Sequence, residues 1–199
     1  VVIGMLFTWF LTGCVVVLIL AMPNLLVGAF GFERADAFKM QSAAIVMQML
    51  GCILAGLLAD RFGAGKVILF GSLAVAIIAG VFYNSLGHVA PSTVFMLYML
   101  LGLFSGTVGM VSYSMVKMFP AQIRFSGISF SYNVAYAIAG GITLPLVQWL
   151  SLYSNIGAMY YIWVVCLVSF FTAMLYRAKF EKQDLAASTI STAQNSIKD

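Results

Sequence analysis

The segment GLLADRFGAGK, residues Gly56 to Lys66, is a short charged stretch between two long apolar runs. No Asp, Glu, Lys or Arg occurs from Met40 to Ala59 before the charges of this segment, and none occurs between Lys66 and Lys117 after it. A helix needs about 20 residues to cross the hydrocarbon core of a bilayer. The segment is therefore predicted to be the turn between two membrane-crossing helices, and the other spans can be placed outward from it.

The overall composition agrees with a membrane protein. Of the 199 residues, 63% are hydrophobic and 8% are charged, whereas an ordinary soluble domain carries roughly 25% charged residues. A soluble chain of this length could not bury so much apolar surface, so lipid must solvate much of it. In a membrane protein the net charge of +4 bears on topology, through the loops that hold the positive residues. No nucleic-acid partner is expected.

Charge-free gaps and turn residues divide the chain into six helices. The gap 1–32 holds one span, and the gaps that follow Lys66 and Arg124 are each long enough for two. Polar turn residues split these longer gaps at 84–92 and 151–157. The predicted spans are 3–28, 39–59, 67–84, 93–117, 126–150 and 156–176. The sequence thus predicts an all-α membrane fold, with a six-helix transmembrane bundle over 1–177 and a polar tail over 178–199 that is expected to be disordered.

The positive charges gather on one side of this topology. The connections after the second and fourth spans, together with the tail, hold eight Lys and Arg residues: Arg61, Lys66, Lys117, Arg124, Arg177, Lys179, Lys182 and Lys198. The opposite side holds Arg34 and Lys39 beside Glu33 and Asp36. Because Lys and Arg are enriched in cytoplasmic loops, both termini of the segment are expected in the cytoplasm.

Polar residues recur at helical spacing in several spans. Glycine and alanine in these stripes are expected to allow close helix packing, as in the GxxxG segment from Gly102 to Gly106. Larger polar groups that faced lipid would be costly, so they are expected to line a water-filled path. The predicted cavity residues are Thr8, Thr12, Gln41, Gln48, Tyr113, Tyr132, Asn133 and Tyr136. Pro23 and Pro145 lie within apolar spans and are expected to bend their helices.

Other membrane functions fit the sequence less well. An intramembrane serine protease needs a G-x-S-G nucleophile and a later histidine, but Ser105 lacks the first glycine and His88 precedes it in a loop. A channel filter or sensor helix is not visible, and the segment before Val67 does not complete a phosphate loop. Cys14, Cys52 and Cys166 lie in apolar runs without metal-ligand spacing. We therefore expect no enzyme, no catalytic residue, no metal and no cofactor.

Two motifs carry a family resemblance. The segment from Gly56 to Lys66 resembles the signature loop of the major facilitator superfamily, G-x-L-A-D-R-x-G-x-[RK]-[RK], except that Gly65 replaces a basic residue. The run MFPAQIRFSG from Met118 to Gly127, with the later SYN and GG, is similar to the metabolite:proton symporter family of α-ketoglutarate, shikimate and proline/betaine permeases. The segment MPNLL from Met22 to Leu26 resembles the M-P-[ST]-Y-L of that family.

The resemblance places the six spans as helices seven to twelve of a twelve-helix transporter. It implies a cytoplasmic gate formed by Gly56, Asp60, Arg61, Gly63, Lys66 and Arg124. The sequence departs from the family at Lys117, where Glu is usual, and at Asn24-Leu25, which replaces Ser/Thr-Tyr. The first departure concerns the gate and the second concerns the substrate path.

The resemblance implies the C-terminal half of a secondary transporter in a bacterial inner membrane. Its expected function is proton-coupled uptake of a small polar metabolite, an organic acid or a zwitterionic osmolyte, by alternating access. The expected partners are the missing N-terminal six-helix half, the lipid bilayer, the substrate and protons. No Asp, Glu, Lys, Arg or His lies deep in a span, so proton coupling is expected to come mainly from the missing half. An uncoupled facilitator, or a half-bundle with a structural or interaction role, remains open.

Overall fold

The computed structural model describes residues 1–154 and 156–181, and it confirms the six predicted spans. Helices long and apolar enough to cross a membrane cover Val2–Phe30, Arg34–Phe62, Ala64–Ser85, Pro91–Met118, Arg124–Tyr153 and Gly157–Phe180. Each helix extends beyond the predicted span at one or both ends, because charged and turn residues form the first and last helical turns. The helical segment runs on to Glu181, and the rest of the predicted tail lies outside the described residues.

The first and fourth spans change helix type near their middle, the sixth changes only at its last turn, and the other three are continuous α-helices. The first span consists of α1 (Val2–Cys14), the π-helical η1 (Val15–Ala21) and α2 (Met22–Phe30). The fourth consists of α5 (Pro91–Ser105), the 3₁₀ turn η2 (Gly106–Val108) and α6 (Gly109–Met118). The others are α3 (Arg34–Phe62), α4 (Ala64–Ser85), α7 (Arg124–Tyr153) and α8 (Gly157–Tyr176), the last followed by η3 (Arg177–Glu181).

The connection between α3 and α4 is a single residue, Gly63. Its φ of 91° and ψ of 143° lie in a region that only glycine occupies without strain. At the other end of the bundle, Gly31 ends α2 with a φ of 70°, and the Phe32 N–H donates to the Leu26 carbonyl at 3.1 Å. This left-handed cap is the usual end of a helix at glycine. Both tight turns place consecutive spans antiparallel to each other.

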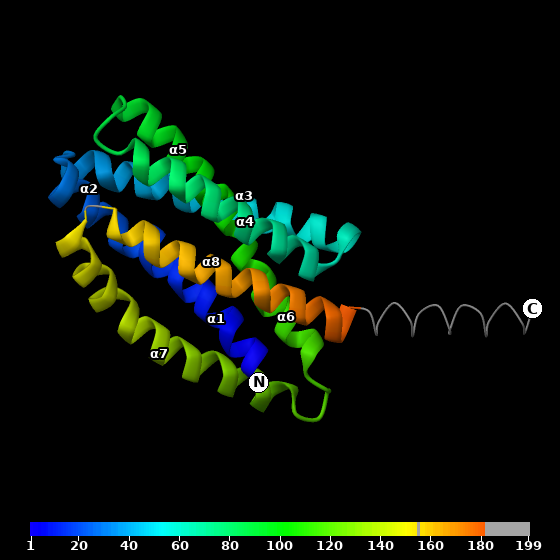
Figure 1. Cartoon of the computed structure of the whole chain (residues 1–199). Coiled ribbons are helices and arrows are strands. Elements are labelled where there is room, and N and C mark those ends of the chain that lie inside the picture. Colours follow the sequence, from blue (N-terminus) through cyan, green and yellow to red (C-terminus); the bar gives the residue numbers. More distant parts are fainter. Residues whose placement is uncertain (155, 182–199) are drawn as a thin grey trace, which may run out of the picture.

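The spans form two three-helix units that pack in a repeated order. The first unit is the first span with α3 and α4, and the second is the fourth span with α7 and α8. In each unit the first span packs on the second helix of the other unit, so α1 contacts α7 and α5 contacts α3. The third helices, α4 and α8, pack on each other along much of their length (Figure 1). Such internal repeats are typical of transporter folds.

Glycines allow α3 and α5 to approach each other closely. A Cβ on Gly51 would collide with the Leu103 carbonyl, and a Cβ on Gly102 would collide with the Ala44 backbone. A Cβ on Gly106 would in turn collide with the backbone at Gly51. Small residues favour such contacts in lipid because backbone approach increases van der Waals packing. The GxxxG segment therefore acts in helix packing within this bundle.

The π-helical break in the first span is satisfied by side chains from two other helices. Pro23 has no N–H to donate to the preceding turn. A residue at this place would donate to the Ile19 carbonyl in an α register, or to the Leu18 carbonyl in a π register. Gln41 Nε2 of α3 donates to the Ile19 carbonyl at 2.8 Å, and the Tyr98 hydroxyl of α5 donates to the Leu18 carbonyl at 2.6 Å. Whichever of the two carbonyls loses its helical donor thus receives one from a side chain, as a membrane interior requires.

This arrangement predicts that Tyr98→Phe and Gln41→Leu each destabilise the bundle. Each substitution keeps the approximate volume of the side chain but removes one hydrogen bond to a carbonyl at the break, which costs about 0.5–1.5 kcal/mol. The midpoint of thermal unfolding of the detergent-solubilised chain should fall for both variants. Tyr160→Phe is the matched control, because Tyr160 is 46% exposed and no described residue bonds its hydroxyl. Equal midpoints for Tyr98→Phe and the control would contradict the prediction.

Candidate functional site

The two interrupted spans occupy equivalent places, because each is the first span of its three-helix unit. In η1 the helix widens to a π turn before Pro23, and in η2 it tightens to a 3₁₀ turn between Gly106 and Val108. Interrupted helices at corresponding positions of two repeats mark the substrate site in many transporters, and π and 3₁₀ segments within helices are frequent at functional hinges. The two breaks therefore mark one candidate position in the first span and one in the fourth.

The break in the fourth span is stabilised locally. Ser105 Oγ donates to the Gly102 carbonyl at 2.7 Å, and Thr107 Oγ1 donates to the Phe104 carbonyl at 3.0 Å. Both hydroxyls belong to buried residues, and they add donors to carbonyls whose helical bonds change near the 3₁₀ turn. The fourth span thus holds its irregular backbone with its own side chains, whereas the first span depends on α3 and α5.

The predicted cavity residues in the first span lie in the packed interior. Thr8 and Thr12 are both fully buried. Thr8 Oγ1 donates to the Gly4 carbonyl at 3.0 Å, and Thr12 Oγ1 donates to the Thr8 carbonyl at 2.8 Å. A threonine hydroxyl commonly satisfies itself in this way on the preceding helical turn. In this conformation neither residue lines an open surface, which differs from the expectation drawn from the sequence.

The two glutamines of α3 are both half-buried but differ in their contacts. Gln41 donates to the Ile19 carbonyl at the π-helical break, so its amide has a structural role at the candidate position in the first span. Gln48 lies two turns further along the same helix, and its side chain makes no hydrogen bond to the described part of the chain. Of the two glutamines, Gln48 is therefore the one whose amide is not bonded to the described part of the chain.

The polar residues of α6 and α7 are more accessible. The rings of Tyr132 and Tyr136 stack with centroids 5.8 Å apart and planes at 10°, and Tyr136 is 42% exposed. Asn133 is exposed, and its Nδ2 donates to the Ser129 carbonyl at 2.8 Å. On α6, Tyr113 is 38% exposed, and Lys117 Nζ lies 4.9 Å from its ring centroid. These helices therefore present tyrosine and amide groups on open faces.

A buried polar chain links three helices and was not predicted from the sequence. Trp9 Nε1 of α1 donates to the Tyr161 hydroxyl of α8 at 3.0 Å. The Tyr161 hydroxyl lies 2.6 Å from Thr143 Oγ1 of α7. Thr143 belongs to a polar stripe in the sequence, but its partners are aromatic residues in apolar runs. Buried Trp and Tyr usually find a hydrogen-bond partner for the polar tip of the ring, and that is the signal that could have identified them.

The predicted prolines differ in their effects. Pro23 is buried directly after η1, at the start of α2, so the irregular backbone lies where its N–H is missing. Pro145 lies inside α7, which continues as one curved helix from Arg124 to Tyr153 (Figure 1). Only the first proline therefore coincides with a change of helix type.

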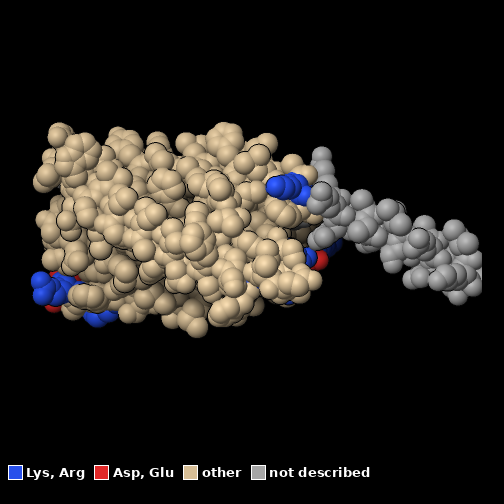
Figure 2. Space-filling view, turned by 90° about the horizontal axis from the view of Figure 1, so that it is seen from below, with Lys and Arg blue, Asp and Glu red and all other residues tan. Residues whose placement is uncertain are grey.

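The charged residues lie at the two ends of the bundle, with an uncharged belt between them (Figure 2). Asp60 is exposed and has no ion-pair partner among the described residues. Arg61 lies over the Phe62 ring with 5.4 Å to its centroid, and Lys66 is exposed on the first turn of α4. Arg124 Nε donates to the Phe119 carbonyl at 3.1 Å. The predicted gate residues thus share one end of the bundle, with Gly63 forming the turn and Asp60 left open.

Comparison with known proteins gives relatives that are transporters. No protein-family model matches the chain. It is 30% identical over 131 residues to the inner membrane metabolite transport protein YhjE of Escherichia coli, covering 65% of this chain and 30% of that protein. It is 29% identical over 137 residues to a proline/betaine transporter of Escherichia coli, covering 65% and 27% of the two chains. It is 29% identical over 167 residues to the alpha-ketoglutarate permease of Escherichia coli, covering 79% and 37%.

The chain spans about a third of the length of these relatives, and a solved transporter shares its fold. The proton:xylose symporter XylE, a major facilitator superfamily protein, matches with a TM-score of 0.60 over 88% of this chain and 42% of its own, at 15% identity. The expectation that the chain is not an enzyme agrees with the transporter names of all these proteins. The chain is a six-helix bundle of the major facilitator fold, and in sequence it is similar to the metabolite and proline/betaine permeases.

Proposed function

We propose that the chain is the C-terminal half of a secondary active transporter for a small polar metabolite, an organic acid or a zwitterionic osmolyte. The observation that carries the proposal is the paired interruption of the first and fourth spans, η1 and η2, at equivalent places of the two units. Transporters of metabolites, proline/betaine and alpha-ketoglutarate among its relatives support this substrate class. In the proposed mechanism the two halves rock about a central site.

The exposure of α3 and α7 supports a second half. Only 22% of the apolar window of each of these helices is buried, against 50% or more in the other four spans. Gly56 on α3 and Gly141 on α7 have no heavy atom within 4 Å of the position of an added Cβ, so contacts within this chain do not account for them. Small residues permit helices to approach closely. We assign these two faces to contact with the missing N-terminal six-helix half.

The substrate side is proposed to include the accessible polar groups on α6 and α7. Asn133 and Tyr136 are exposed on α7, and Tyr113 is exposed on α6. Exposed amide and hydroxyl groups at membrane depth are tolerated when they line a water-filled cavity. Hydroxyl and amide groups suit a zwitterion or a carboxylate through hydrogen bonds, and both kinds of ligand appear in the names of the relatives.

Proton coupling is proposed to depend on the missing half. In the described spans the Asp, Glu, Lys and Arg residues lie near the helix ends, and a proton relay normally uses an ionisable group inside the membrane. The same observation favours the second candidate function, uncoupled facilitated diffusion. The clustering of Arg61, Lys66, Lys117 and Arg124 at one end supports a cytoplasmic location of that end and of both termini in a bacterial inner membrane.

Uptake by the full-length transporter in proteoliposomes tests the coupling. Radiolabelled proline and α-ketoglutarate are the probes, with an imposed inward proton gradient. Accumulation against the substrate gradient should occur for one of them, and a protonophore should abolish it. Proteoliposomes with this half alone are the control and should not transport. Uptake that a protonophore leaves unchanged would favour facilitated diffusion, and uptake of neither probe would remove the proposed substrate class.

Two substitutions on α7 test the proposed substrate side. Tyr136→Phe keeps the stacked ring on Tyr132 and removes one hydroxyl, and Asn133→Ala removes one amide. Each should raise the apparent KM by about 2- to 10-fold, the range expected for one lost hydrogen bond of about 0.5–1.5 kcal/mol. Ile138→Ala is the matched control, because Ile138 is 58% exposed and points away from Asn133. A KM unchanged in both variants would remove this face from the site.

A pair of glycine substitutions on packed helices tests the assembly of the two halves. Gly56→Leu should leave the thermal stability of this bundle unchanged, since the position is open, but it should lower transport by the full-length protein by blocking the second half. Gly106→Leu should instead lower the stability of the bundle itself, because the added side chain meets the α3 backbone and overpacking costs about 1–3 kcal/mol or more. Full transport by the Gly56→Leu protein would contradict the proposed interface.

A further inference from the structure

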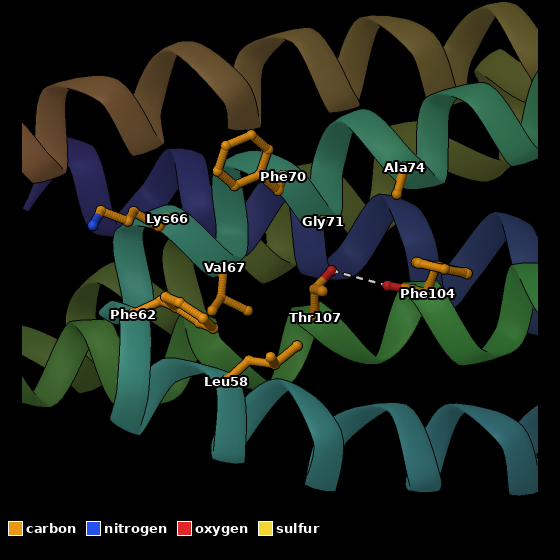
Figure 3. A pocket seen from close by; sticks show the side chains of 9 residues that line it. All are labelled: Leu58, Phe62, Lys66, Val67, Phe70, Gly71, Ala74, Phe104 and Thr107. Carbon is orange, nitrogen blue, oxygen red and sulfur yellow. Dashed lines mark hydrogen bonds between the residues drawn. The ribbon is translucent and has the colours of Figure 1, made fainter.

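A groove opens on the outside of the bundle between α3, α4 and the break in the fourth span (Figure 3). Its volume is about 440 Å³. Leu58 and Phe62 of α3 line one wall, Phe70 and Ala74 of α4 line the other, and Phe104 and Thr107 close the floor. The side chains of Leu58, Phe62, Phe70 and Phe104 are 38–64% exposed, so the groove is accessible from outside the bundle.

The floor of the groove offers no free hydrogen-bond donor to a polar ligand. Thr107 supplies the hydroxyl of the floor, and this hydroxyl already donates to the Phe104 carbonyl at 3.0 Å (Figure 3). A Cβ on Gly71 would collide with the Thr107 side chain, so the glycine is what lets α4 and η2 meet beneath the groove. Apart from Lys66 at one end, the remaining lining is aliphatic and aromatic. An apolar chain is therefore the chemistry that fits the groove.

One end of the groove is cationic. Lys66 lines it from the first turn of α4, and its amine points away from the apolar walls in Figure 3. Residues two apart on a helix point about 160° apart, and residues four apart point in nearly the same direction. Asp60 therefore lies on the side of Gly56, on the far side of α3 from Leu58. The acid is directed away from the groove, and the positive charge of Lys66 is left at its end.

The same geometry separates the groove from the proposed contact with the second half. Gly56 and Leu58 are two residues apart, so they lie on opposite sides of α3. If the missing half packs at Gly56, as proposed above, the side with Leu58 remains exposed to the bilayer. This step alone rests on the proposed function. The long apolar groove with one cation at the membrane surface then matches an amphipathic molecule that is aligned with the spans.

We propose that this groove binds a bilayer phospholipid, with one acyl chain between α3 and α4 and the phosphate at Lys66. Long lysine side chains near helix ends reach toward the interface, where lipid phosphates lie. Each Lys or Arg near the surface attracts anionic lipid by about 1 kcal/mol. The acyl chain would rest on Thr107 of η2, so the bound lipid contacts the irregular segment of the fourth span directly.

Photo-crosslinking in nanodiscs tests the proposal. The chain is placed in phosphatidylethanolamine and phosphatidylglycerol, each in turn carrying a diazirine in one acyl chain, and the labelled residues are mapped by mass spectrometry. Labels should concentrate on 58–74 and on 104–107. Ala74→Trp fills the groove and should reduce this labelling to the level of the other lipid-facing helices. Leu73→Trp is the matched control, because Leu73 is 47% exposed outside the groove lining, and it should leave the labelling unchanged.

The phosphate contact has a separate readout. Lys66→Gln should lower phospholipid retention in native mass spectrometry about fivefold, the factor that corresponds to one attraction of about 1 kcal/mol. Lys179→Gln, in η3 and outside the groove lining, removes a surface charge with no groove beside it and should lower retention less than Lys66→Gln does. Labelling spread evenly over exposed residues, or crosslinks from the groove to a second copy of the chain, would overturn the lipid site. Neither readout measures transport, so a failed uptake assay and a failed lipid assay remain distinguishable.

Discussion

A carbonyl group inside a bilayer must be hydrogen-bonded by the protein, since hydrocarbon offers no donor. Pro23 removes one backbone donor at the break, and the Tyr98 hydroxyl of α5 and the Gln41 amide of α3 donate to the Leu18 and Ile19 carbonyls there. The middle of the first span is therefore held by the two helices whose own crossing depends on Gly51 and Gly106. Close packing of α3 against α5 and the irregular backbone of η1 stabilise each other, and the arrangement of the candidate site follows from both.

The two breaks are alike in position but opposite in geometry. The first span takes a wider π turn and relies on outside donors, whereas the fourth takes a tighter 3₁₀ turn and uses Ser105 and Thr107. A helix whose carbonyls are bonded by side chains of neighbouring helices can change register only when those neighbours move with it. A helix that supplies its own bonds can change alone. The two three-helix units of this chain are thus expected to contribute differently to a rocking motion.

The six spans could be predicted because charges are excluded from hydrocarbon, so the gaps between Lys66 and Lys117 and between Arg124 and Arg177 reveal the helices. The changes of helix type could not be predicted, because the π turn of η1 takes donors from distant helices and the Ser105 and Thr107 hydroxyls at the 3₁₀ turn look like ordinary helical residues in the sequence. Gln41 was recognised as a large polar residue, but its partner Ile19 is set by tertiary contact. Thr8 and Thr12 were placed in a cavity because polarity in a sequence does not show that a hydroxyl bonds its own helix.

The single-residue turn at Gly63 joins α3 and α4 with almost no slack. Two helices that are connected by one residue cannot slide along each other. Their relative motion is limited to rotation about the Gly63 turn. The wall formed by Leu58 and Phe62 and the wall formed by Phe70 and Ala74 then keep their spacing at the hinge while the far ends spread or close. The groove is therefore expected to keep its width at the end that bears Lys66 and to vary in width at the far end.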